Sequence, residues 1–586
     1  PDPNAGPGAA GGFELGVAPL DLVEIKDLTY FYPQTSRPAL EDINLSVSAG
    51  QFVLVVGGSG SGKTSLLRAV AGLIPAFYGG TVAGRVYLQG EDIRNIPRRR
   101  LVQQVGIVFQ DPESQLVMNT LEGELAFGLE NLGLDPALTR RRIVETAAAL
   151  NLGPYLSRPV AQLSGGLKQK AILGSVLAMQ PRVLLLDEPT SQLDPMAGEE
   201  ILAAIRRLNE ENGITVILVE QRLERCFHLA DRVVIMDRGR IVCDAARPGE
   251  AARWAVRTAS PFVPPLARLF AGEGWREVPL TVKEGLRLLN RELSRAGDKL
   301  PPGEGPLAKK SALAGGTPLV KVKDLWFTYP NGQEALRGID LTVKAGDFTI
   351  IMGENAAGKT TLLKVLRGLL KPGRGLVRVL GRDIARTPVE ELAGEIGYLS
   401  QNPDDHFFLP TVEEELNYTR KKLGLPVPFD AGEMLAQLGL AGVAGKNPRD
   451  LSQGERQRVA LAVVMAASPR VLLLDEPTRG LDYQAKRDLG ELLRRLREQG
   501  QAIVVVTHDV EFAAEYGEEI VLLSAGRVVA RGEKHEVLTG GVFYSPQVSR
   551  LFQDTPYRVV TLEEGRQILR RLRQGRDSKL RREEIL

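Results

Sequence analysis

The fold is decided by residues 57–64, which read Gly57-Gly58-Ser59-Gly60-Ser61-Gly62-Lys63-Thr64. This stretch follows an apolar run, Phe52 to Val56, and precedes Ser65 and a helix-like pattern. A strand, a glycine loop and a helix start in this order predict a phosphate-binding loop. The glycines leave backbone N–H groups free to face an anion, and the helix N-terminus adds a positive dipole. Lys63 supplies a point charge, and the Thr64 hydroxyl can ligate Mg²⁺.

A second loop of this kind lies at residues 353–360, with the sequence Gly353-Glu354-Asn355-Ala356-Ala357-Gly358-Lys359-Thr360. It also follows an apolar strand pattern, Phe348 to Met352, and Thr361 comes directly after it. A single glycine turn with a lysine could be incidental, but two complete matches in one chain argue against that interpretation. In a chain of 586 residues, the repeat predicts two large domains in tandem.

Composition excludes several classes of protein. Lys and Arg number 74 against 72 Asp and Glu, so the net charge of +2 gives no global attraction to nucleic acid, and we expect none as a partner. Two cysteines, Cys226 and Cys243, are too few for a disulfide framework or a structural zinc site. No uncharged apolar stretch approaches the roughly 18 to 20 residues that a membrane span needs. A membrane role must therefore come through a partner.

Two aromatic residues and two glutamines recur at matching places in the halves. Tyr32 and Tyr329 precede the two phosphate loops, and we expect each ring to stack on an adenine. An isolated aromatic before a proline is more often a core or turn residue, but the matched placement favours the binding role. Gln110 and Gln401 each follow a strand pattern and precede a loop, which suggests ligands that sense Mg²⁺ or a γ-phosphate.

Each half then has a short Ser/Gly turn that enters a helix. The turns are Leu163-Ser164-Gly165-Gly166 and Leu451-Ser452-Gln453-Gly454. Such a turn can bind an anion, although either alone would be an ordinary helix cap.

About twenty residues after each turn, an apolar strand pattern ends in two acids. The pairs are Asp187-Glu188 and Asp475-Glu476. Ligands bind at the carboxyl ends of buried parallel strands. The first acid of each pair could ligate a metal ion, and the second is placed to polarise a water molecule. The alternative is that both acids are solvated charges without a catalytic role.

The order of these motifs resembles the ABC ATPase family, twice. Each series closes with a short loop, Ser191-Gln192-Leu193-Asp194 or Arg479-Gly480-Leu481-Asp482. Within that family, the segments at 109–116 and 124–128 most resemble the ATPases of energy-coupling-factor importers, which take up vitamins or transition-metal ions. The resemblance implies an α/β fold with two P-loop NTPase domains, each with a helical subdomain and a small C-terminal extension.

The resemblance also implies a head-to-tail pair of domains that bind ATP and Mg²⁺ and hydrolyse ATP. In this arrangement the turn of one half closes over the nucleotide of the other. Site one would combine the first phosphate loop, Ser65, Tyr32, Gln110, Asp187, Glu188 and Gln221 with Ser452, Gln453 and Gly454. Site two would combine the second phosphate loop, Thr361, Tyr329, Gln401, Asp475, Glu476 and His508 with Ser164, Gly165 and Gly166. The Mg²⁺ ligands would be Thr64, Gln110 and Asp187 in site one, and Thr360, Gln401 and Asp475 in site two.

The two halves differ at one position that matters for chemistry. After the next strand the second half has His508, the family's switch histidine, where the first half has Gln221. A histidine can donate a hydrogen bond toward the γ-phosphate as a neutral ring or as a cation, whereas glutamine offers a neutral amide. Glu188, Glu476, His508 and Gln221 are therefore the candidate catalytic residues, and we expect faster hydrolysis at site two.

An extension follows each ATPase domain. Arg268 and Thr281 have counterparts at Arg550 and Thr561, and each threonine has a glutamate three residues on, which predicts a helix start. We expect a disordered tail at 1–20, domains at 21–245 and 318–535, extensions at 246–295 and 536–586, and a linker at 296–317. The arginine-rich end, 566–582, is interpreted as a solvated helix face, with anionic-lipid contact as the alternative.

We expect the chain to sit on the cytoplasmic face of the membrane and to power an importer. Coupling helices of a transmembrane subunit would enter grooves after Gln110 and Gln401, and a substrate-binding membrane subunit would be engaged indirectly. Charge reversals at Glu124 and Glu415 should then uncouple transport with basal ATPase largely kept. The alternative is a twin-ATPase translation factor of the ABC-F family acting on the ribosome, although the inter-domain stretch lacks its long basic arm. A DNA-repair ATPase is less favoured, because no coiled-coil insertion interrupts either half.

Overall fold

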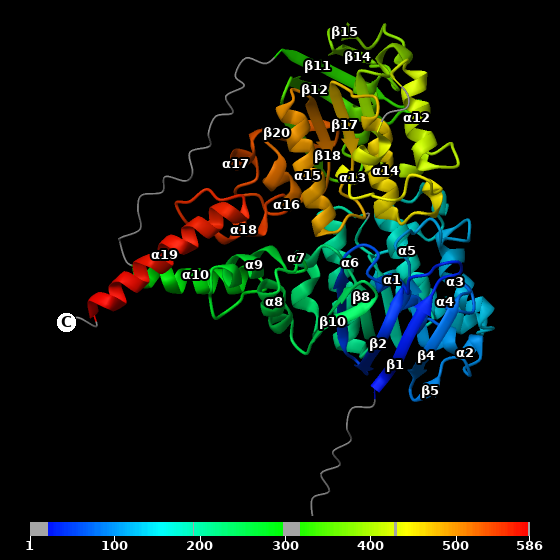
Figure 1. Ribbon diagram of the computed structural model, residues 1–586. Coiled ribbons are helices and arrows are strands. Elements are labelled where there is room, and N and C mark those ends of the chain that lie inside the picture. Colours follow the sequence, from blue (N-terminus) through cyan, green and yellow to red (C-terminus); the bar gives the residue numbers. More distant parts are fainter. Residues whose placement is uncertain (1–20, 192, 297–316, 427–429, 584–586) are drawn as a thin grey trace, which may run out of the picture.

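A computed structural model describes residues 21–583 except for 192, 297–316 and 427–429. The expected tail and nearly all of the expected linker lie outside the described residues. Two similar halves lie against each other, and a pair of helices extends from their junction (Figure 1). Among the described residues, every helix is too short or too polar to cross a bilayer.

The first half has two sheets. The antiparallel one runs β2-β1-β4-β5, and the central one runs β10-β9-β3-β8-β7-β6, parallel except for β10. The strands are β1 (Asp21–Phe31), β2 (Leu40–Ser48), β3 (Phe52–Gly57), β4 (Thr81–Leu88), β5 (Glu91–Asp92), β6 (Val105–Val108), β7 (Val183–Asp187), β8 (Thr215–Val219), β9 (Arg232–Asp237) and β10 (Arg240–Ala245). Strands β3, β7 and β8 are buried along their whole length, because helices cover one face of the central sheet and α1 (Lys63–Val70) with the antiparallel sheet covers the other.

Helices α3, α4 and α5 form a subdomain between β6 and β7. The helices of this half are α1 (Lys63–Val70), α2 (Arg98–Gln104), α3 (Leu121–Asn131), α4 (Pro136–Ala149), α5 (Gly165–Ala178), α6 (Pro195–Asn212) and α7 (Leu223–Cys226). Thr120 caps α3 by accepting a hydrogen bond from Gly123 N, so the helix starts at Leu121.

The second half repeats this plan, with sheets ordered β12-β11-β14-β15 and β16-β17-β18-β13-β19-β20. Its strands are β11 (Pro318–Thr328), β12 (Glu334–Lys344), β13 (Phe348–Gly353), β14 (Arg374–Val379), β15 (Arg382–Asp383), β16 (Ile396–Leu399), β17 (Val471–Asp475), β18 (Ala502–Val506), β19 (Glu519–Ser524) and β20 (Arg527–Glu533). Its helices are α11 (Lys359–Arg367), α12 (Val412–Lys422), α13 (Ala431–Gln437), α14 (Gln453–Met465), α15 (Tyr483–Glu498), α16 (Val510–Tyr516) and α17 (Lys534–Val537). The expected α/β class with two P-loop domains is confirmed.

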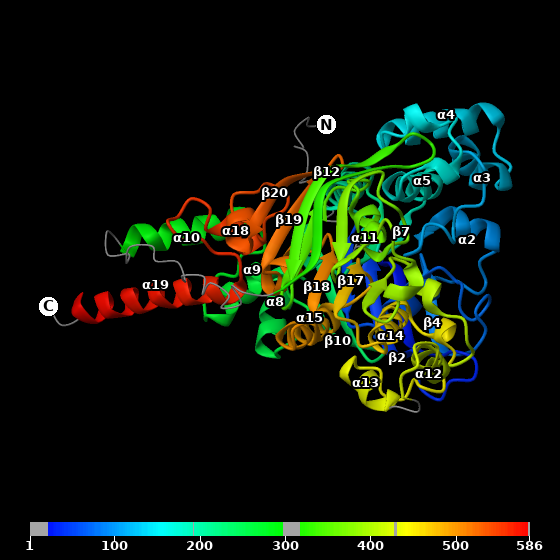
Figure 2. The same ribbon diagram turned by 90° about the horizontal axis from the view of Figure 1, so that it is seen from above.

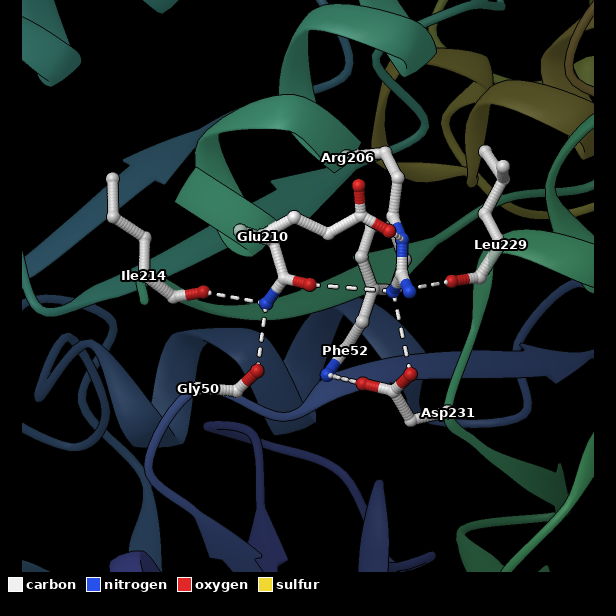
Figure 3. Close-up of polar contacts among 8 residues, drawn as sticks. Gly50, Phe52, Arg206, Glu210, Ile214, Leu229 and Asp231 are labelled. Atoms are coloured by element: carbon white, nitrogen blue, oxygen red, sulfur yellow. Dashed lines mark hydrogen bonds and ion pairs between the residues drawn. The ribbon is translucent and has the colours of Figure 1, made fainter. Parts of the chain in front are cut away.

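A polar network fixes the start of β3, the strand that leads into the first phosphate loop (Figure 3). Asn209 of α6 donates to Gly50 O and to Ile214 O, each at 2.8 Å. Arg206, one turn earlier, donates to Leu229 O at 2.9 Å and to Asp231 Oδ1 at 3.3 Å. The other oxygen of Asp231 accepts from Phe52 N at 2.8 Å. Helix α6 and the segment before β9 therefore hold the base of the loop in place.

The two extensions pack on each other. They contain α8 (Pro248–Arg257), α9 (Pro265–Gly272) and α10 (Val282–Ala296) in the first half, and α18 (Gln547–Leu551) and α19 (Leu562–Glu583) in the second. Figure 2 shows α10 and α19 side by side. Fully buried residues of both extensions, such as Leu289 and Leu569, share one apolar cluster. Burying one such side chain contributes about 2 kcal/mol, so this cluster is a substantial tie between the halves.

Candidate functional site

Both phosphate loops need glycine just before the helix. Gly62 has φ 98° and Gly358 has φ 97°, in the left-handed region that glycine favours. A Cβ at Gly62 would lie 2.6 Å from Ala39 O, so no side chain fits. In each loop the lysine amine folds back: Lys63 Nζ donates to Gly57 O at 2.8 Å and to Gly58 O at 2.7 Å. The loop thus holds its own cation where a phosphate would sit.

The two acid pairs lie at the ends of β7 and β17, as predicted. Burial raises the pKa of Asp475, although a hydrogen bond from Thr360 opposes the rise. Asp187 and Thr64 repeat this pair in the first half. Asp475 Oδ2 is buried without a hydrogen-bond partner among the described residues, and a carboxylate oxygen in that state suits a hard cation. The donor set therefore fits Mg²⁺.

The second acid of each pair is strained and protonates easily. Glu188 has φ 48° and Glu476 has φ 52°, a left-handed conformation that costs a non-glycine residue about 1 kcal/mol or more. Burial, followed by the neighbouring Asp187, raises the pKa of Glu188 to about 8. Burial and Asp475 raise the pKa of Glu476 to about 7. Acids of this kind are poised for proton transfer near neutral pH.

The surroundings of these glutamates differ between the halves. Both oxygens of Glu188 accept from amides: Gln110 Nε2 at 2.7 Å and Gln221 Nε2 at 2.5 Å. Glu476 Oε2 accepts from His508 N at 3.3 Å, and His508 Nε2 lies 3.3 Å from the other oxygen without the alignment of a hydrogen bond. Gln401 is exposed, so its metal role stays a prediction. Two glutamines hold the carboxylate of Glu188 in site one, whereas among the described residues no glutamine donates to Glu476.

His508 is neutral at pH 7 in this structure. Burial, together with the charges of Lys359, Arg222 and Arg225, lowers its pKa well below the ordinary value. The ring can still donate one hydrogen bond to a phosphate, but the charged form considered from the sequence is not the resting one.

A cavity of about 810 Å³ joins the two halves at site one. It brings together most of the residues predicted for that site, namely Tyr32, Ser59, Gly60, Ser61, Gly62, Lys63, Thr64, Ser65, Gln110, Asp187, Glu188 and Gln221 with Ser452, Gln453 and Gly454. Gly57 and Gly58 lie at the floor of the loop, where they accept from Lys63. Residues that are far apart in the sequence therefore form one site.

The loop before α15 ties the halves together at this cavity. Asp482 Oδ2 accepts from Ser59 N at 2.6 Å, and its other oxygen caps α15 through Ala485 N at 2.8 Å. On the second side, Asp194 of the first half is close enough to Lys359 to oppose the lowering of its pKa by burial. In both cases an aspartate of one half lies near the phosphate loop of the other half, which is a head-to-tail arrangement. The contributions of Ser164, Gly165 and Gly166 to site two stay predictions.

Sequence reasoning missed part of the wall of site one. Arg68 Nη1 donates to the Tyr32 hydroxyl at 2.8 Å, and that hydroxyl lies 3.1 Å from Ser65 Oγ. The guanidinium carbon of Arg68 is 4.2 Å from the centre of the Tyr78 ring, and Phe77 lines the same cavity. In the second half the Tyr329 hydroxyl lies 3.0 Å from Thr361 Oγ1. The residue that corresponds to Arg68 in this half is Lys364. Because Arg68, Phe77 and Tyr78 do not recur, the repeat gave no signal for them.

Known proteins resemble the chain along most of its length. A family model described as ABC transporter matches residues 40–191 and 336–479. An ABC transporter ATP-binding protein of Streptomyces avermitilis is 40% identical and covers 92% of this chain and 99% of its own length. One from Methanosarcina mazei is 35% identical, with 90% of each chain covered.

Among solved structures, cbiO1 from Clostridium perfringens, described as part of the ABC transporter complex cbiONQ, is 28% identical. The match covers 40% of this chain and 95% of the cbiO1 chain, with a TM-score of 0.36. The family match and the full-length relatives give a clear assignment. This chain belongs to the ABC transporter family as an ATP-binding subunit, an ATPase with two ABC domains in tandem.

Proposed function

We propose that this ATPase powers a membrane importer of the energy-coupling-factor type, for a vitamin or a transition-metal ion, from the cytoplasmic face of the membrane. The sequences after Gln110 and Gln401 resemble those of such importers. The observation that carries the proposal is a pair of exposed apolar side chains at matching places in the two halves. Val117 is 64% exposed and Phe408 is 76% exposed. A single exposed apolar side chain is ordinary, but its recurrence at the same place in both halves supports a surface that a partner covers.

The loops that present these side chains are held by buried glutamates. Glu124 Oε2 accepts from Val117 N at 3.0 Å and from Met118 N at 2.8 Å. Glu415 Oε1 accepts in the same way from Phe408 N and Leu409 N. Glu124 is 3% exposed and Glu415 is 1% exposed, so the sequence-based choice of these residues as partner contacts was wrong. Reversing their charge would disrupt the loop itself, and Val117 and Phe408 are the better probes.

The site chemistry follows from positioning and charge. The loop amides with Lys63 or Lys359 would hold the phosphates of ATP, and the ring of Tyr32 or Tyr329 would face the adenine. Mg²⁺, when bound, neutralises charge on the phosphates. Thr64 with Asp187, and Thr360 with Asp475, would hold that ion.

Glu188 or Glu476 would polarise the attacking water. Site two has the freer carboxylate and the histidine, so we assign the faster hydrolysis to it.

Photo-crosslinking at Val117 and Phe408 tests the proposal in cells that carry the natural partners. A photoreactive residue at either position should capture a multi-spanning membrane protein. Val529, on β20, is 62% exposed and serves as a control that should capture little. Capture of ribosomal proteins at Val117 and Phe408 would overturn the proposal in favour of a translation factor, and equal capture at Val529 would remove its specificity.

A further inference from the structure

Tyr483, the first residue of α15, binds the first half through its whole side chain. Its ring packs against the core of the first half, and its hydroxyl donates to Glu224 Oε2 at 3.0 Å. The guanidinium carbon of Arg268 lies 5.6 Å from the ring centre, within cation–π range. Arg268 is itself held in place, because its Nη2 donates to Pro261 O at 2.6 Å. An arginine and a glutamate thus form a receptor for a phenol group.

The other side of the molecule repeats this receptor. Arg550 follows Arg268 by 282 residues, and its Nη2 donates to Phe543 O at 3.3 Å, as Arg268 donates to Pro261. Glu511 follows Glu224 by 287 residues, the same interval that separates His508 from Gln221. The arginine and the glutamate are therefore both present.

The phenol is missing on this side. Helix α6 begins with Pro195 where α15 begins with Tyr483. A cavity of about 380 Å³ lies there, with Pro195, Glu511 and Arg550 in its wall beside His508 and Gln547. The cavity that corresponds to it across the molecule has Tyr483 in its wall. Arg550 Nε and Gln547 Oε1 are enclosed without hydrogen-bond partners among the described residues. The second receptor is thus built, and no tyrosine among the described residues fills it.

The charges of the wall indicate what kind of molecule would fit. Three arginines and three glutamates line the cavity: Arg222, Arg225, Arg550, Glu199, Glu224 and Glu511. Asp509 adds a fourth acid, so the two signs are nearly balanced and the wall has no strong attraction for a highly charged ligand. Burial and the charge of Glu224 raise the pKa of Glu511 to about 8, so Glu511 itself is mostly protonated and uncharged at pH 7. One oxygen of Glu511 accepts from Gln547 N at 3.0 Å, which leaves the other for a ligand.

We infer that this cavity binds a small uncharged aromatic molecule that carries a hydroxyl group, the chemistry of a tyrosine side chain. Its ring would lie on Arg550 and its hydroxyl would form a hydrogen bond with the free oxygen of Glu511. The bound molecule would link α6 of the first half to the second extension, as Tyr483 links α15 to the first extension. It would also contact the segment that carries His508, next to site two.

The probe is 4-methylphenol, the tyrosine side chain as a free molecule, titrated into the full chain and followed by ligand-observed NMR. We expect saturable binding, and about tenfold weaker binding of toluene, which lacks the hydrogen bond. Pro195→Tyr should fill the cavity and abolish the binding. Arg550→Met should weaken it about tenfold by removing the cation–π contact. The matched control Arg268→Met, on the other side of the molecule, should leave it unchanged.

The controls separate this cavity from other apolar sites. Absence of saturable 4-methylphenol binding to the wild-type chain would overturn the inference. So would binding that survives unchanged in Arg550→Met, or that is lost in Arg268→Met instead. If Pro195→Tyr does not fold, the two methionine variants and the toluene comparison decide the question by themselves.

Discussion

Single residues distinguish the two ATP sites more sharply than the fold does. Glu188 and Glu476 end equivalent strands, yet Glu188 is held at both oxygens by Gln110 and Gln221. A carboxylate that already accepts two hydrogen bonds is a weaker acceptor for the proton of an attacking water. Glu476 has a single backbone donor, from His508 N. The contacts of the two glutamates therefore favour faster ATP hydrolysis at site two.

Replacing Gln221 with histidine should raise hydrolysis at site one. In a Glu476→Gln background, where site one supplies the remaining activity, we expect Gln221→His to increase the single-turnover rate about 10-fold to 100-fold. An aimed donor is worth about 10² to 10³ in rate, and glutamine already recovers part of it. The reciprocal variant, His508→Gln in a Glu188→Gln background, should lower the rate.

Two results would contradict this assignment. The first is that Glu188→Gln alone abolishes activity while Glu476→Gln leaves it near wild type. The second is an unchanged rate in Gln221→His, which would show that glutamine already serves as well as histidine.

The residues found from the sequence are those that occur twice. Lys63 and Lys359, or Asp187 and Asp475, stand out because each supports the interpretation of the other. Arg68 and Phe77 occur in one half alone, so no pattern separated them from ordinary surface residues. Glu124 was found but misjudged, because a pattern shows that an acid recurs and says nothing of whether its carboxylate faces solvent or caps a loop. Those contacts depend on tertiary packing.

At the scale of elements, the extensions show how a local pattern can predict a structure. Thr281 and Thr561 each accept a hydrogen bond from the backbone of the glutamate three residues on, Glu284 and Glu564, as the spacing predicted. The structure adds that α10 and α19 pack against each other. The partner of an amphipathic helix cannot be read from the helix's own sequence, so the sequence left this pairing open.

The second extension is attached to α17 by an ion pair with a defined pH range. His535 Nε2 lies 2.8 Å from Glu564 Oε1, and this hydrogen bond raises the pKa of His535. Burial opposes ionisation of Glu564, but His535 and the N–H groups of Val560 and Thr561 outweigh it and lower its pKa to about 2. The contribution of Glu564 to the free energy of unfolding is complete above the ordinary pKa of a glutamate. It is lost as the pH falls through about 2. The histidine's contribution is complete below its ordinary pKa and is lost as the pH rises through its raised value.

The stability lost in His535→Gln should therefore depend on pH. Between about pH 5 and pH 6.5 both groups are charged in the folded chain, and we expect a loss on the order of 1 kcal/mol. The loss should shrink as the pH rises through the raised pKa of His535, because the wild-type ring then becomes neutral as well. Thermal unfolding of both proteins across this range gives the difference. A loss that stays constant with pH would show that the ring acts by packing alone.

At the scale of the whole molecule, the head-to-tail arrangement makes the first ATP site depend on both halves, and we expect the same of the second. Ser59 of the first phosphate loop binds Asp482 of the second half, and Ser452, Gln453 and Gly454 face the same cavity. A defect in one half should thus affect closure over both nucleotides, while the affinity for each nucleotide depends mainly on its own loop.

The wild-type chain should bind two molecules of ATP in the presence of Mg²⁺. Lys63→Ala and Lys359→Ala should each reduce the stoichiometry to one, because each lysine supplies the positive charge of one loop. Equilibrium titration with a fluorescent ATP analogue measures this directly. Stoichiometry of one in the wild type, or loss of both sites in a single variant, would refute two independent loops.

The apolar cluster shared by the extensions also sets the kinetics of closure. Two separate ATPase subunits must meet by diffusion and lose translational and rotational freedom, at a cost of about 4 to 15 kcal/mol. Here that loss is incurred once, when the chain folds, because Leu289 and Leu569 lie in one cluster. Each half then encounters the other at an effective concentration on the order of millimolar, whatever the amount of protein in the cell. Opening and closing of the two halves would then be unimolecular, with a rate independent of dilution.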